Sequence, residues 1–138
     1  MKTYNIFISH SWTYSNIYYK LIEFLDNAKY FSYNNHSIPI HDPIHTNGTD
    51  KQLYEAIYNR ILGCHIVLIP TGVYSTHSKW INKEIKIAKK GYNIGPKPII
   101  GVNPWGQRNI SSIVENNADI IVGWNSNSIV DAIRQYSL

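Results

Sequence analysis

The residue that stands out in this sequence is a single glutamate on an otherwise regular amphipathic helix. The stretch from Ser75 to Gly91, STHSKWINKEIKIAKKG, places Ile81, Ile85 and Ala88 on one apolar face at about 100° per residue, with its lysines opposite. Glu84 projects about 60° from the centre of that face, and none of its neighbours three or four positions away can pair with it. A carboxylate at the rim of a core costs free energy unless a distant group uses it, so Glu84 is our candidate functional residue.

Two structural interpretations of Glu84 stay open beside the functional one. The side chain can extend past Trp80 into solvent, or it can form an ion pair with a lysine or arginine elsewhere in the fold. Other chemistries lack their residues, because the chain has no phosphate-binding GxxxxGK[ST] loop and no GxGxxG fingerprint. His41 and His45 have the spacing of a helical zinc pair, but Pro43 lies between them, and we expect no metal site.

Length and composition predict one globular domain over residues 1–138. Hydrophobic residues make up 43% of the chain and charged residues 16%, which is typical of a folded domain. No apolar run approaches the roughly 20 residues of a membrane helix, and the N-terminus MKTYNIFISHSW lacks the segments of a signal peptide. With its single cysteine, the chain is therefore expected to be cytoplasmic. The lysine face of the Glu84 helix accounts for much of the positive charge behind the net charge of +4, and nucleic-acid binding is not indicated.

Short apolar runs alternate with helical patterns along the whole chain. The runs predict five β-strands, at Tyr4–Ser9, Ser37–Ile40, His65–Pro70, Pro98–Val102 and Asp119–Val122. Pro39 confines the second of these strands to an edge of the sheet. Helices are predicted between strands and after the last one, with a capping box from Thr49 and Gln52 and an N-cap at Ser126.

This alternation predicts an α/β fold of the flavodoxin-like type, a five-stranded parallel sheet covered by helices on both faces. We expect the strand order 2-1-3-4-5. In such sheets ligands bind beyond the carboxyl ends of the strands, near the switch between strands one and three. The segments after Ser9, Ile40, Ile69 and Val102 open on that edge, together with the first turn of the Glu84 helix.

Five stretches together carry a resemblance to a known family: YNIFISHSW at the N-terminus, DPI after the second strand, SKWINKEI, KPIIGVNPWG, and ADIIVGWNSNSIVDAIR. The chain resembles the TIR-like domain family, and more narrowly the ThsB subunits of Thoeris antiphage defence. The Trp-x-x-x-Glu spacing in SKWINKEI is a weak pattern alone. Its place one loop after the third strand, with FISH on the first strand and PWG after the fourth, makes it specific.

The resemblance implies an enzyme that cleaves NAD, as a substrate and not as a cofactor, at the bond between nicotinamide and ribose. Its product would be a cyclic or otherwise modified ADP-ribose that activates a separate, sirtuin-like (ThsA-like) effector as a diffusible signal. The family's catalytic glutamate falls on Glu84 and the tryptophan before it on Trp80. A carboxylate beside the ribose can stabilise the oxocarbenium-like charge left when nicotinamide departs, and Trp80 can exclude water.

The segments after the first two strands would hold the rest of the dinucleotide. The candidate substrate-binding residues are Ser9, His10 and Trp12 from the first segment and Asp42 from the second. Both segments depart from many TIR domains, since His10 and its neighbours stand where many relatives have a basic or acidic residue, and the second segment is uncharged apart from Asp42. The sequence leaves the linkage of the product, the infection trigger and homo-oligomerisation open.

Two other functions stay open as well. A TIR-type interaction module without activity of its own would make Glu84 incidental. A nucleoside deoxyribosyltransferase-like enzyme would also need a carboxylate near an anomeric carbon. Release of nicotinamide from NAD separates the preferred hypothesis from both alternatives.

Overall fold

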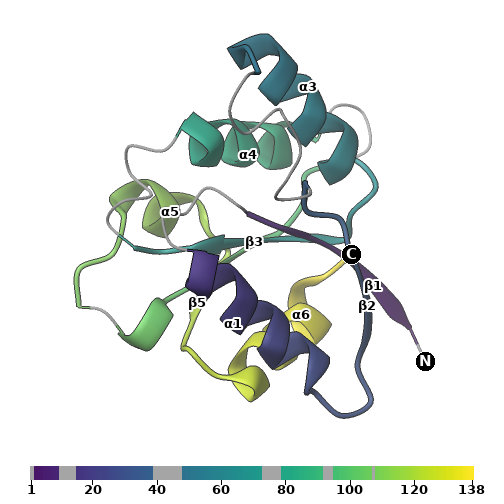
Figure 1. Cartoon of the computed structure of the whole chain (residues 1–138), viewed down its shortest axis with the longest axis vertical. Helices are drawn as coiled ribbons and strands as arrows, with labels where there is room; N and C mark the ends of the chain where they lie inside the picture. The colour runs from purple at the N-terminus through teal and green to yellow at the C-terminus, as the bar shows by residue number, and fades with distance from the viewer. Residues whose placement is uncertain (1, 10–14, 39–47, 73–78, 92–94, 107) are drawn as a thin grey trace.

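A parallel sheet of five strands forms the centre of the molecule. The computed structural model describes residues 2–9, 15–38, 48–72, 79–91, 95–106 and 108–138 (Figure 1). The strands are β1 (Thr3–Ile8), β2 (Ser32–Asn35), β3 (Ile66–Pro70), β4 (Ile99–Val102) and β5 (Ile120–Val122). Their order is β2-β1-β3-β4-β5, and every neighbouring pair is parallel. The predicted fold class and strand order are confirmed.

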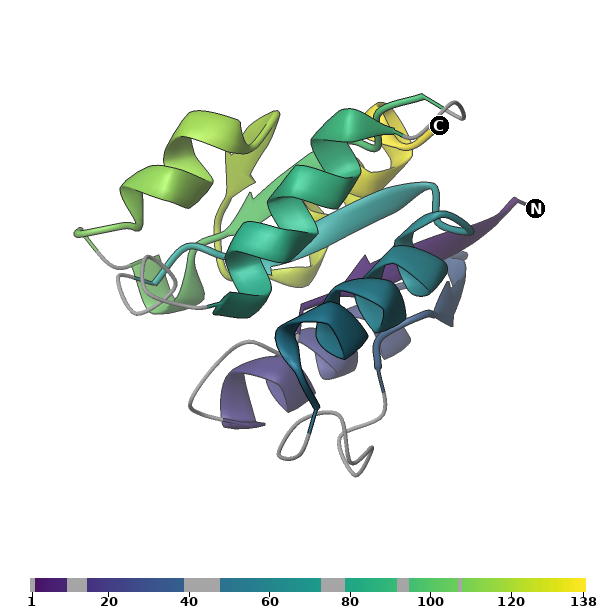
Figure 2. The same cartoon turned by 90° about the horizontal axis from the view of Figure 1, so that it is seen from above.

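Helices cover both faces of this sheet (Figure 1). On one face lie α1 (Ser15–Asp26) and α6 (Ser126–Tyr136), and on the other lie α3 (Asp50–Ile61), α4 (Lys79–Lys90) and α5 (Ser112–Asn117). In Figure 2, which looks down on this layer, α4 lies between α3 and α5 in front of the sheet. A short 3-10 helix, η2 (Pro104–Gly106), follows β4. The helix that carries Glu84 is thus the middle one of its layer.

The central strand β3 contributes to both halves of the core because it is buried on both faces. Ile66 and Leu68 pack in the cluster of α1 and α6, whereas Val67 and Ile69 pack in the cluster of α3 and α4. This division follows the two-residue period of a strand. The helix α4 contributes its apolar face to the second cluster through Ile81, Ile85, Ile87 and Ala88.

The prediction for the second strand is wrong. β2 is formed by Ser32–Asn35, whereas the predicted segment Ser37–Ile40 begins only after the strand has ended. Pairing with β1 decides the strand, since Tyr33 lies opposite Tyr4, and an edge strand tolerates exposed polar side chains. The apolar signal of Ile38 has another cause, because its side chain is buried in the cluster of α3 and α4. The last two residues of the predicted segment, 39 and 40, lie outside the described residues.

Helix capping follows the prediction in one case and departs from it in another. Thr49 and Gln52 form the predicted capping box at the start of α3. The N-cap of α6 is Asn125, whose side chain accepts a hydrogen bond from a backbone N–H of the first turn, and not Ser126 as predicted. Ser126 Oγ donates to the Phe24 carbonyl oxygen at 2.7 Å and so joins α6 to α1.

The chain leaves α4 through Gly91, in the left-handed conformation (φ 70°) that ends many helices. The Gly91 N–H donates to Ile87 O at 3.2 Å, and the Lys97 N–H donates to Ala88 O at 2.8 Å. A Cβ at residue 91 would lie 2.3 Å from the Gly95 carbonyl carbon, which no side chain can accommodate. Glycine at this position therefore fixes the end of the helix that carries Glu84.

We expect Gly91→Ala to lower the free energy of unfolding by at least about 2 kcal/mol, because the positive φ and the backbone contact both disfavour a side chain. Gly63→Ala is the matched control, since a Cβ there meets nothing closer than 4.0 Å. Urea unfolding of both variants measures the difference. Equal stability of the two variants would contradict this account of how α4 ends.

Candidate active site

Two polar residues that lie far apart in the sequence meet at the carboxyl edge of the sheet, which is the end formed by the C-termini of its parallel strands. Ser9 directly follows β1, and Glu84 lies in the second turn of α4. Ser9 Oγ donates a hydrogen bond to Glu84 Oε1 at 3.1 Å, and both residues have 0% of their surface exposed. The end of β1, beside β3, is the switch point where ligands bind in this class of sheet.

Secondary structure fixes the positions of both Ser9 and Glu84. The Ser9 N–H donates to Leu68 O at 3.0 Å, so hydrogen bonding between β1 and β3 continues to the residue that carries the hydroxyl group. On α4, the buried side chains of Ile81, Ile85 and Ala88 fix the rotation of the helix about its axis. The backbone therefore sets the position of the hydroxyl and carboxyl groups.

Glu84 is buried more deeply than its helical angle predicts. The periodicity places it at the rim of the core, whereas the structure leaves it no exposed surface, because α4 packs at the end of β1. Complete burial excludes the first structural interpretation, extension past Trp80 into solvent. The second is not met either, since no lysine or arginine among the described residues lies within ion-pair distance of Glu84.

The environment of Glu84 favours the neutral form of its carboxyl group. Burial raises the pKa of Glu84 from 4.5 to about 8, and the hydrogen bond from Ser9 offsets part of that rise. The second carboxyl oxygen, Oε2, has no hydrogen-bond partner in the part of the chain that the structure describes. A cation or a hydrogen-bond donor that reaches Oε2 would lower the pKa and ionise the group.

The structure describes two of the five predicted substrate-binding residues. Ser9 contacts Glu84, and Trp80 lies one turn before Glu84 on α4, where it is partly buried and packs against the cluster of α3 and α4. The other three, His10, Trp12 and Asp42, lie outside the described residues. Two elements thus bring Ser9, Trp80 and Glu84 to one end of the sheet.

Sequence reasoning missed two further residues on the same edge. Thr71 directly follows β3, is fully buried, and has a hydroxyl oxygen without a hydrogen-bond partner among the described residues. Trp105 in η2 follows β4, is 57% exposed, and has a left-handed backbone with φ 52°. A tryptophan in that conformation is strained, and such strain gathers at functional sites. The motif PWG was visible in the sequence, but its backbone conformation was not.

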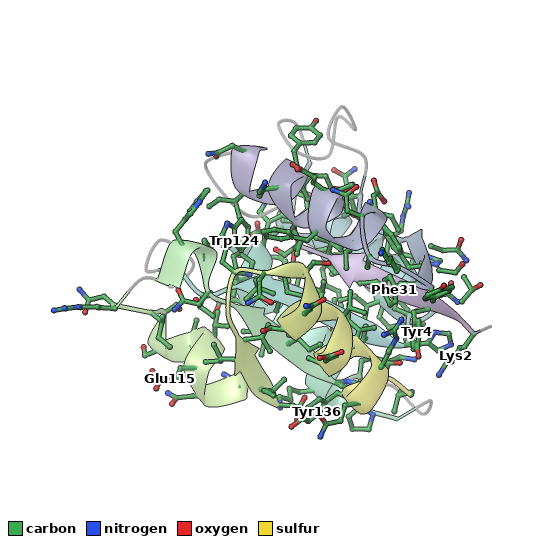
Figure 3. The ribbon with its side chains drawn as sticks, turned by 90° about the horizontal axis from the view of Figure 1, so that it is seen from below. Lys2, Tyr4, Phe31, Glu115, Trp124 and Tyr136 are labelled. Carbon is green, nitrogen blue, oxygen red and sulfur yellow. The ribbon has the colours of Figure 1, made fainter. Side chains whose placement is uncertain are left out.

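Trp105 is the outer member of a cluster of three aromatic rings. Its ring lies 5.1 Å, between centroids, from that of Trp124, which follows β5. Trp124 in turn meets Phe24 of α1 edge-on at 5.1 Å, and Figure 3 shows Trp124 beside the start of α6. Because β4 is the neighbour of β3, this aromatic cluster presents an exposed indole at the same end of the sheet as Ser9 and Glu84.

A family model described as Thoeris protein ThsB, TIR-like domain, matches residues 7–109 of the 138-residue chain. The chain belongs to the ThsB TIR-like domain family. The match includes Ser9, Trp80, Glu84 and Trp105, whereas Trp124, which packs against Trp105, lies beyond it. ThsB membership associates the chain with Thoeris defence and, in general terms, with a ThsA-type partner system. No curated protein matches the chain, so no relative assigns roles to these residues.

Other reactive groups give no second catalytic centre within the described ranges. No three histidine, cysteine, aspartate or glutamate side chains gather there as metal ligands, and His41 and His45 lie outside these ranges. Burial raises the pKa of the Cys64 thiol to about 12, so this thiol is not a nucleophile at neutral pH. Among the described helices, none has the length and apolar character that crossing a membrane requires.

Replacing Glu84 with glutamine should make stability less sensitive to pH. The folded protein binds the Glu84 proton more tightly than the unfolded chain, so this stability contribution is complete below about pH 4.5 and is lost as the pH rises to about 8. Glutamine has no proton to lose. We expect the melting temperature of Glu84→Gln to exceed that of the wild type by about 5 °C at pH 8.5, and by less at pH 5.

Thermal denaturation at the two pH values measures this difference. The control is Glu55→Gln, which changes an exposed carboxylate on α3 and is expected to leave the pH dependence unchanged. A Glu84→Gln variant that is less stable than the wild type at pH 8.5 would instead indicate that the charged group is stabilised by the fold.

Proposed function

We propose that this chain is an enzyme that cleaves NAD at the bond between nicotinamide and ribose, with Glu84 as its catalytic residue. The observation that carries the proposal is the fully buried Glu84 carboxyl group, which accepts one hydrogen bond from Ser9 and has a second oxygen without a partner among the described residues. It lies at the edge where ligands bind in this class of sheet. NAD is the substrate, and the reaction needs no further cofactor.

The reaction needs a negative charge beside the ribose. When the C1′–N bond to nicotinamide breaks, the electron pair leaves with nicotinamide, and the ribose becomes an oxocarbenium-like cation. An ionised Glu84 in a site that excludes water stabilises this charge more strongly than a solvated carboxylate does. Because nicotinamide is a good leaving group, one carboxylate is sufficient, and Glu84 is the buried acid that the described residues provide.

The raised pKa of Glu84 suits this role because the reacting ring of the substrate is itself a cation. In the empty site the carboxyl group is mostly protonated at neutral pH. A positively charged nicotinamide ring beside Oε2 favours the carboxylate, and the proton leaves to solvent. The site is then charged when the substrate is present and neutral when it is absent.

Aromatic residues would hold the rest of the substrate and control access of water. Trp80 would exclude water from C1′, which favours capture of the oxocarbenium carbon by another atom of the same nucleotide and hence a cyclic or modified ADP-ribose. The exposed indole of Trp105 offers a surface on which adenine can stack. His10, Trp12 and Asp42 are proposed as further substrate-binding residues.

Glu84→Gln keeps the size of the side chain but cannot ionise. We expect it to lower nicotinamide release from NAD by at least about a hundredfold, while Glu55→Gln retains activity. In the wild type, kcat/KM should rise with pH and reach half its maximum near pH 8, because the carboxylate is the active form. Chromatography of nicotinamide, with and without lysate of phage-infected cells, measures both effects. A folded Glu84→Gln variant with normal turnover would remove Glu84 from the mechanism.

The product is proposed to activate a separate, sirtuin-like effector of the ThsA type, a partner class that membership of the Thoeris family supports. Protein-free filtrate from infected cells that express this chain should then activate the purified effector. Filtrate from cells that express Glu84→Gln should not. If activation required the protein itself and the filtrate were inert, a non-catalytic interaction module would be the better explanation.

A further inference from the structure

A second polar hollow lies at the amino edge of the sheet, opposite the end that carries Ser9 and Glu84. Its volume is about 250 Å³, and its lining is formed by Lys89, Pro96, Lys97, Pro98, Asp119 and Tyr136. These residues come from the last turn of α4, the segment before β4, the residue before β5, and the end of α6. Figure 3 shows Tyr136 at that end of α6, away from Trp124. The hollow is therefore separate from the proposed NAD site.

Lys97 is the unusual member of this lining. It is 7% exposed, yet its ammonium group forms no ion pair and no hydrogen bond with the described residues. The neighbouring elements cover most of this side chain, whereas its ammonium group is not among the buried polar atoms and borders the hollow.

The backbone holds Lys97 firmly in this position. Its N–H donates to Ala88 O at 2.8 Å, and the carbonyl of the next residue, Pro98, accepts from the Val67 N–H at 3.0 Å. Proline on both sides further restricts the conformation. A rigid segment thus holds the lysine beside the hollow, where no described carboxylate lies within ion-pair distance of its ammonium group.

The charges around the hollow favour an anion. Lys89 and Lys97 contribute two positive charges and Asp119 contributes one negative charge. Asp119 Oδ2 already accepts the Ile99 N–H at 2.8 Å, so this carboxylate is directed to the backbone at the start of β4. The lining therefore has a net charge of about +1 around an unpaired ammonium group.

Stabilisation of the C-terminus of α4 is the competing explanation for these lysines. The side chain of Lys97 is not needed for that purpose. The backbone N–H groups of Gly91 and Lys97 already donate hydrogen bonds to Ile87 O and Ala88 O. A role at the helix end would also not explain why a hollow lies beside the ammonium group. The two explanations differ in their effect on stability. Without phosphate, Lys97→Met should lower the free energy of unfolding if the lysine stabilises the helix end, and leave it nearly unchanged if the lysine serves a ligand.

We propose that the hollow between α4, β4 and α6 binds a small phosphate-bearing anion, with the ammonium groups of Lys97 and Lys89 as its ligands. Lysine binds phosphate as a compact point charge with three donors. The ring of Tyr136 on the wall of the hollow gives room and an apolar surface for a sugar or base attached to the phosphate. This ligand site is independent of NAD cleavage.

Isothermal titration of the purified chain with sodium phosphate, at ionic strength held constant with sodium chloride, tests the proposal. We expect saturable binding that weakens about tenfold or more in Lys97→Met and several-fold in Lys89→Met. Lys86→Met is the matched control, because Lys86 is an exposed lysine of the same helix outside the hollow, and its affinity should stay within about twofold of the wild type. Equal weakening in all three variants, or no binding beyond the chloride background, would overturn the proposal.

A second measurement keeps the test decisive if Lys97→Met does not fold. Phosphate should shift the backbone amide resonances of Lys97 and Asp119 in the wild-type protein and leave those of Ser9 and Glu84 unchanged. Comparing inorganic phosphate with ribose 5-phosphate and AMP then distinguishes a free ion from a sugar phosphate or a nucleotide. Shifts confined to the carboxyl edge of the sheet, or a loss of stability in a folded Lys97→Met, would show that the lysine is structural.

Discussion

The complete burial of the Glu84 side chain is the constraint on which the site at the C-terminal ends of the strands depends. Glu84 has no exposed surface, and its hydrogen bond to Ser9 joins the middle of α4 to the end of β1. Such burial is unfavourable for a charged group. It persists because α4 cannot rotate the carboxyl group outward without exposing Ile81, Ile85 and Ala88, whose burial between the helix and the sheet is favourable. The packing of the core thus keeps the carboxyl group buried, although burial is unfavourable for its charged form.

The same helix connects two sites with opposite electrostatic requirements. Glu84 lies in its second turn, and Lys89 lies five residues later, about 7.5 Å along the helix axis. Lys97 follows Gly91, in the segment that returns the chain to β4. At one end of the sheet the buried carboxyl group of Glu84 stays neutral by protonation. At the other end the ammonium groups of Lys89 and Lys97 border a hollow that we propose to bind an anion. Because α4 is a rigid element, each charge has to be balanced at its own edge, by a proton or by a ligand.

Periodicity and spacing were sufficient for those features that repeat along the chain. The alternation of apolar runs and helices predicted the parallel sheet covered on both faces, and the helical angle of Glu84 identified it as the outlier of α4. The edge strand β2 was misplaced because polar residues paired on one side leave no apolar pattern to detect. Trp105 and Lys97 were missed for a related reason: a left-handed backbone and a lysine side chain covered by neighbouring elements are properties of tertiary structure. Sequence patterns report which face a residue lies on, but not what covers that face.

The raised pKa of Glu84 resolves a conflict between stability and the proposed chemistry. Stabilising a cationic ribose requires a charge in a dry site, and a permanent charge in that site would destabilise the folded protein. With a pKa of about 8, the empty site holds a neutral acid near pH 7 and avoids most of this cost. A cationic substrate then restores the charge at the moment when it is useful, because its own field lowers the pKa. Burial and the single hydrogen bond from Ser9 therefore keep Glu84 neutral in the empty site, and the proposed cationic substrate supplies the positive charge that stabilises its ionised form.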